Sequence, residues 1–112
     1  MNLWRYLLSA LILLVAVGLW GRFRMALARH HMRRGVDHLR QHRPLEAIRE
    51  LQEATTDLGR EPEVWYYLAL AFSQAGDFSD GRDALARALR ADPDHGPSLE
   101  LVEKLRQNGE KE

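Results

Sequence analysis

The sequence predicts an all-α protein in which an N-terminal transmembrane helix is followed by a short α-solenoid. Three observations support this fold class. Residues 6–20 contain no charged side chain, and residues 62–93 carry apolar side chains at helical spacing. Residues 28–61 carry a related pattern 34 positions earlier. Together these observations predict an anchor, two helix–turn–helix units and a final capping helix.

Residues 1–21 are expected to form a membrane anchor. Between Leu3 and Gly21, nineteen residues contain only one charge, that of Arg5. As a helix this stretch spans about 28 Å, close to the hydrocarbon thickness of a bilayer. Aromatic residues, which favour the membrane interface, lie near both ends: Trp4, Tyr6 and Trp20.

Two alternatives to an anchor exist for this stretch. A buried helix of a soluble protein should show a polar face, and residues 6–20 show none. A cleaved signal peptide is the other alternative, because Ala16-Val17-Gly18 is a small-x-small triplet. We expect the segment to remain uncleaved and to span the membrane once.

The charge distribution predicts the orientation of the anchor. Residues 1–43 contain eight Arg and one Asp, whereas residues 44–112 contain eight Lys or Arg and fifteen Asp or Glu. Five of the arginines follow within fifteen residues of Trp20. The positive-inside rule therefore places the following domain in the cytoplasm, with the N-terminus outside. We expect the membrane to be a bacterial inner membrane. A periplasmic domain is the alternative.

Residues 22–27 are expected to form a basic juxtamembrane helix continuous with the anchor, because residues 22–42 contain no Pro. An apolar heptad stripe runs along it through Met25, Ala28, Met32, Gly35 and Leu39. Its lower half can be the core of the following domain, while its upper half can contact another membrane protein. Anionic lipid headgroups are also expected to bind here. The expected membrane-proximal contact residues are Phe23, Met25, Leu27, Arg22 and Arg24.

Residues 62–95 predict two helices joined by a tight turn. Pro62 suits a first helical position, where its missing N–H is not needed. Gly76 can adopt the left-handed conformation that ends a helix, and Asp77 can cap the next one, with Asp80 in its first turn. Asp92-Pro93 is expected to end the second helix.

This segment resembles the tetratricopeptide repeat, a helix–turn–helix unit of 34 residues. The resemblance is carried by Trp65, Leu68, Ala69, Phe72, Gly76, Phe78, Leu85, Ala88 and Pro93. It implies that the small Ala69 lies where the two helices touch, with the large apolar groups filling the seam around it. One departure is Gly81, where the family usually has Ala, and it is expected to weaken the helix by about 1 kcal/mol.

A degraded first repeat is expected over residues 28–61, with the second over residues 62–95. Gly35 takes the place of Ala69, and His42 takes the place of the turn glycine. Pro44 is expected to open the second helix of this repeat, with residues 55–61 as the link and Glu46, Glu50 and Glu53 facing solvent. Residues 96–107 are expected to form the capping helix that solenoids need. Residues 108–112 are expected to form a polar tail.

The sequence contains no sign of catalytic chemistry, and we expect neither an enzyme nor a cofactor. The absence of cysteine excludes disulfides, zinc–thiolate sites and cysteine nucleophiles. His38 and His42 are four residues apart, with His31 roughly on the same face, but His38 and His42 occupy a seam and a turn position of the repeat, so no metal site is expected. The acidic repeat body argues against nucleic acid. No small-molecule substrate is expected.

The resemblance implies a partner-binding groove, because the first helices of successive repeats line a concave surface in this family. The corresponding positions are Met32, Val36, Leu39, Tyr66, Leu70, Ser73 and Gln74. Tyr66 is the expected hot spot. The alternative is that the final helix covers part of this surface through Leu99, Leu101, Val102 and Leu105.

We therefore predict a non-catalytic membrane-anchored scaffold. It would act as an accessory or assembly subunit that binds other subunits of a larger membrane complex. The alternative is a chaperone-like receptor that transiently captures peptides at the membrane.

Overall fold

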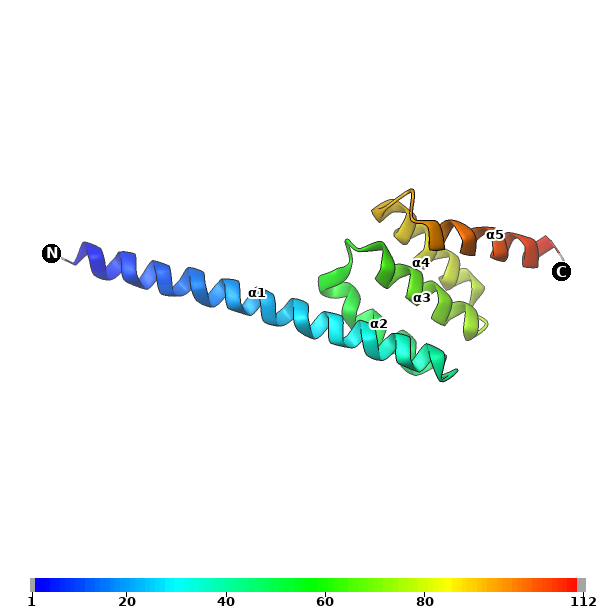
Figure 1. Cartoon of the computed structure of the whole chain (residues 1–112), viewed down its shortest axis with the longest axis horizontal. Coiled ribbons are helices and arrows are strands. Elements are labelled where there is room, and N and C mark those ends of the chain that lie inside the picture. Colours follow the sequence, from blue (N-terminus) through cyan, green and yellow to red (C-terminus); the bar gives the residue numbers. More distant parts are fainter. Residues whose placement is uncertain (1, 111–112) are drawn as a thin grey trace.

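A computed structural model describes residues 2–110, and within this range the chain forms five α-helices and no strand (Figure 1). The helices are α1 (Leu3–Arg40), α2 (Pro44–Leu58), α3 (Pro62–Gln74), α4 (Phe78–Ala91) and α5 (Gly96–Glu110). The predicted all-α class is confirmed. The first residue of the expected anchor and the last two of the expected polar tail lie outside the described residues.

The longest element is α1, which projects far beyond the bundle formed by α2–α5 (Figure 1). Its first half, through Trp20, is exposed along its whole length, and the helix is long and apolar enough to cross a membrane. Its second half packs on the bundle and buries Ala28 and Gly35. The expectation of one helix running from the apolar segment into the first repeat is therefore confirmed.

The absence of a side chain at Gly35 allows α1 to lie close against α2. A Cβ atom at this position would lie 2.6 Å from Cγ of Leu51, which is fully buried. No side chain larger than hydrogen fits there unless Leu51 moves. The residue that replaces Ala69 in the first repeat is thus small for a steric reason.

The turns of the two repeats share a left-handed residue. Gly76 has φ +85° between α3 and α4, and His42 has φ 57° between α1 and α2. Left-handed conformations are uncommon for residues other than Gly, although His is among those that adopt them more often. After the second turn, the Asp77 side chain accepts a hydrogen bond from the Asp80 backbone N–H at 3.2 Å, which confirms the expected cap.

The core follows the apolar faces of α2, α3 and α4. Ala69 is completely buried, and its carbonyl oxygen would lie 3.4 Å from a Cβ at Gly81. Such a Cβ would also lie 3.1 Å from Oγ of Ser73. Gly81 therefore lowers helix propensity in α4 but permits its close approach to α3.

Three local expectations were wrong. Helix α2 continues to Leu58, so residues 55–58 are helical and the link is shorter than predicted. Helix α5 continues to Glu110, beyond the predicted end of the cap. Phe78 is 45% exposed rather than enclosed in the seam, because it lies at the first turn of α4, at the edge of the bundle.

Candidate partner-binding groove

Ion pairs attach α1 to α2 and to the link that follows it. They join Arg24 to Asp57 at 2.8 Å, Arg29 to Glu61 at 3.0 Å, His31 to Glu50 at 2.5 Å, and Arg34 to Glu50 at 3.6 Å. The basic N-terminal part of the sequence thus meets part of the acidic remainder within the same molecule. The Arg24–Asp57 and Arg29–Glu61 pairs, whose arginine side chains are about half exposed, contribute about 0–1 kcal/mol each, so their main effect is to fix how α1 lies on the repeats.

Glu50 was expected to face solvent, and that expectation was wrong. Its side chain is only 15% exposed and reaches across to His31 and Arg34 on α1. The hydrogen bond with His31 lowers the pKa of the Glu50 carboxyl below its usual range, against the opposing effect of burial, and Arg34 lowers it further.

The three histidines considered as metal ligands differ in their hydrogen-bond contacts. His31 contacts Glu50, and Nδ1 of His42 lies 3.4 Å from Nε2 of Gln74. Nδ1 of His38 is buried and has no hydrogen-bond partner among the described residues. Within residues 2–110, no three potential metal-binding side chains gather at one point.

A groove of about 600 Å³ lies between α1, α3 and α5. Its lining residues are Val36, Leu39, Arg40, Tyr67, Leu70, Ser73, Gln74, Phe78, Leu101, Lys104, Leu105 and Asn108. Five of the seven predicted groove residues are among them: Val36, Leu39, Leu70, Ser73 and Gln74. The other two, Met32 and Tyr66, are half-buried against the core instead.

The tyrosine that lines the groove is Tyr67, next to the one proposed from the sequence. The Tyr66 ring lies 5.8 Å from the His95 ring and 5.4 Å from the Tyr67 ring. Burial, followed by the nearby Tyr67 and Glu100, raises the pKa of the Tyr66 phenol. Helical spacing does not distinguish the two tyrosines, because Tyr66 and Tyr67 lie four and three residues before Leu70 and either can share its face.

Helix α5 forms one wall of this groove. Leu101 is buried and Leu105 half-buried, and both line it. Leu99 and Val102, which were also considered as a cover, remain exposed. The final helix therefore borders the groove with two of the four residues considered.

The side chains lining the groove are apolar, neutral or cationic. Arg40 and Lys104 supply the positive charges, and no Asp or Glu is among the lining residues. At the end of α1, the Gln74 amide donates a hydrogen bond to the Leu39 carbonyl at 3.3 Å. This bond connects α3 to α1, the two helices that carry the predicted groove residues.

The predicted membrane-proximal residues lie on α1 between the apolar segment and Ala28, the first residue of this helix that is buried in the bundle. Phe23, Met25 and Leu27 are all exposed, and the Phe23 ring lies 5.8 Å from that of Trp20. Arg22 is also exposed, whereas Arg24 is held by Asp57. The apolar stripe divides between Met25, which stays outside the core, and Ala28, which joins it.

Residues 32–96 match the sequence profile of the family described as Tetratricopeptide repeat. Because the match covers more than half of the chain, this protein belongs to the tetratricopeptide repeat family. Repeats of this family typically bind other proteins and are not catalytic. A search of curated proteins found no match to the sequence.

Proposed function

We propose that this protein is a membrane-anchored scaffold that holds a protein partner in the groove between α1, α3 and α5. It would be an accessory or assembly subunit of a larger complex in a bacterial inner membrane, with the repeats in the cytoplasm. The observation that carries the proposal is the continuity of α1. The same helix supplies the exposed apolar segment and, through Val36 and Leu39, one side of the groove.

This arrangement would fix the groove at a defined height above the bilayer. Val36 lies fifteen residues beyond Gly21, which corresponds to about 22 Å along a helix axis. A partner in the same membrane would therefore meet the groove with part of its own cytoplasmic region. The anchor would also raise the effective concentration of the two proteins for each other.

The lining of the groove defines the kind of partner expected. Leu70, Leu101 and Leu105 offer an apolar surface, while Arg40 and Lys104 offer positive charge. An amphipathic helix or an extended apolar segment with acidic residues beside it would satisfy both features. A strongly basic segment would meet like charges and no carboxylate.

The proposal can be tested by photo-crosslinking in native membranes. A photoreactive amino acid would replace Leu70 in the full-length chain, and a second protein would carry it at Leu45. Leu45 is 71% exposed on α2 and does not line the groove. We expect an adduct of defined mass from position 70 and none from position 45.

The strength of the association would separate a permanent subunit from a transient receptor. A partner that also co-purifies in mild detergent without crosslinking would be a stable subunit. An adduct that forms only under irradiation would indicate the peptide receptor. Equal adducts from positions 70 and 45 would show that the groove is not the binding surface.

A further inference from the structure

The end of the repeat bundle that faces the apolar segment carries the α2–α3 and α4–α5 links (Figure 1). The Arg24–Asp57 ion pair attaches the last turn of α2 to α1, and the Arg29–Glu61 ion pair attaches the first of these links to it. Arg24 and Arg29 lie three and eight residues beyond Gly21, or about 5 and 12 Å along the helix axis. If the anchor spans the membrane as proposed, this link lies in or just outside the lipid headgroup layer.

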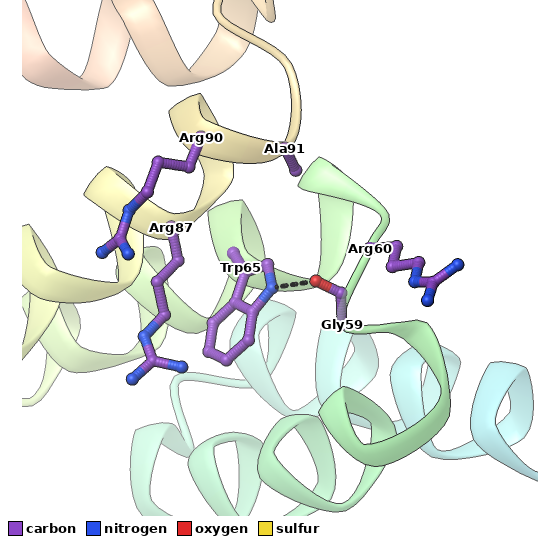
Figure 2. Close-up of a pocket in the computed structure, with 6 residues that line it drawn as sticks. All are labelled: Gly59, Arg60, Trp65, Arg87, Arg90 and Ala91. Atoms are coloured by element: carbon purple, nitrogen blue, oxygen red, sulfur yellow. Dashed lines mark hydrogen bonds between the residues drawn. The ribbon is translucent and has the colours of Figure 1, made fainter.

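An open pocket of about 430 Å³ lies at this end of the bundle (Figure 2). Its lining residues are Gly59, Arg60, Trp65, Arg87, Arg90 and Ala91. The indole N–H of Trp65 donates a hydrogen bond to the Gly59 carbonyl at 2.8 Å, which fixes the ring against the link. The Arg87 guanidinium carbon lies 4.9 Å from the centre of that ring.

The pocket concentrates positive charge, although Trp65 and Arg87 also border an adjoining pocket that Asp80 and Asp83 line. Arg60, Arg87 and Arg90 are exposed, and none of them forms an ion pair within residues 2–110. No Asp or Glu lines the pocket. Arg87 and Arg90 are three residues apart, so they project from the same face of α4, on one side of Trp65 in Figure 2, and Arg60 borders the other side.

We propose that this pocket binds the phosphate group of an anion, and that its place beside the membrane makes the phosphodiester of an anionic lipid the natural source. Guanidinium groups match phosphate oxygens with paired N–H donors, and Arg87 can do so while its charge lies over the indole. A tryptophan side chain is also suited to the interface between lipid and water. Assigning a lipid source rests on the proposed membrane anchor, whereas phosphate recognition itself does not.

Binding can be measured on the full-length protein in neutral detergent through the emission of Trp65. Trp4 and Trp20, both exposed on α1, would be replaced by Phe so that Trp65 is the only indole. The titrants would be short-chain phosphatidylglycerol, short-chain phosphatidylcholine and inorganic phosphate. We expect a saturable change with phosphatidylglycerol, and an apparent affinity at least about tenfold lower in Arg87→Gln/Arg90→Gln.

A matched control keeps the change in net charge equal. Arg49→Gln/Arg82→Gln removes two exposed arginines outside the pocket and should retain the parent affinity. Because Arg87 touches the reporting indole, Arg90→Gln alone provides a second variant that keeps this contact. It should also weaken binding.

The titrants distinguish the two sources of phosphate. Saturation by phosphatidylglycerol alone would assign a lipid headgroup, and saturation by inorganic phosphate as well would assign the phosphate group itself. No saturable change with either, or an equal affinity in the Arg87→Gln/Arg90→Gln variant, would overturn the proposal. A response to phosphatidylcholine equal to that with phosphatidylglycerol would do the same. The titration involves neither a protein partner nor a bilayer, so its failure would leave the crosslinking test of the groove unaffected.

Discussion

Replacing Gly35 with alanine should destabilise the repeat domain, even though alanine favours a helix by about 1 kcal/mol over glycine. The new Cβ would lie 2.6 Å from Cγ and 2.9 Å from Cδ2 of Leu51, and 3.4 Å from the Ala47 carbonyl oxygen. Leu51 is fully buried, so it cannot move without displacing its neighbours. Overpacking of this kind costs about 1–3 kcal/mol. The net loss in the free energy of unfolding should therefore reach up to about 2 kcal/mol.

A double-mutant cycle would separate steric overlap from helix propensity. Leu51→Ala alone should cost about 2–5 kcal/mol, because it leaves a cavity in the core. In that background the methyl group of Gly35→Ala enters the cavity, so the substitution should become neutral or stabilising. The two substitutions should then show a coupling energy of at least about 1 kcal/mol.

Denaturant unfolding of the full-length chain in detergent would supply these values, with Trp65 as the only indole. Its emission reports on the repeat bundle rather than on the apolar half of α1. If Gly35→Ala stabilised the parent and the Leu51→Ala variant by the same amount, helix propensity rather than steric overlap would determine the effect of the substitution. The close contact between α1 and α2 would then not limit the size of residue 35.

Three further outcomes are expected. A reporter fused after Glu112 should show activity in the cytoplasm and none in the periplasm. Periplasmic activity would reverse the proposed orientation. The fold lowers the pKa of the Glu50 carboxyl from its ordinary value of 4.5. The stabilisation by the ionised carboxylate should therefore be complete above about pH 4.5, and it should be lost as the pH falls through the lower pKa of the folded state. Glu50→Gln should accordingly be less stable than the parent near neutral pH and should converge with it in acid, whereas parallel urea curves at both pH values would contradict this. Tyr67→Ala should weaken binding of the crosslinked partner by about 2 kcal/mol, and Tyr66→Ala should weaken it less. The opposite order in a binding titration would restore Tyr66 as the hot spot.

Local rules were sufficient for most of the helix boundaries. Pro62 begins α3, Gly76 adopts the left-handed turn and Asp77 caps α4, each as its own chemistry predicts. The continuity of α1 followed from the absence of proline after the apolar segment. These features depend on neighbours in sequence, and a sequence displays such neighbours directly.

The less predictable features depend on contacts between helices. Glu50 looked like a solvent-facing residue of an amphipathic helix, but its partners His31 and Arg34 are on α1. Nothing near Glu50 in the sequence identifies a cation across the interface. Gly81 likewise looked unfavourable until the approach of α3 became visible.

The sequence predicted that α1 and α3 line the groove, but it did not identify every side chain that lines it. A step of one residue rotates a side chain by about 100° around a helix, which is enough to exchange Tyr66 for Tyr67. Leu101 and Leu105 were named as residues through which the final helix could cover this surface, but the sequence did not separate them from Leu99 and Val102, which remain exposed. The position of α5 on the bundle, which decides this, is set by packing rather than by the spacing of the repeat.

Because α1 is unbroken, the number of residues in the juxtamembrane segment determines the direction in which the groove faces around the helix axis. From Leu3 to Arg40 the helix has no interruption that could act as a swivel. One residue inserted between the anchor and Arg22 would therefore turn the groove by about 100° around the helix axis while raising it by only about 1.5 Å. A partner fixed in the same bilayer would then face a different side of the repeats at nearly the original height. Seven inserted residues would restore its direction to within about 20° and add about 10 Å of height.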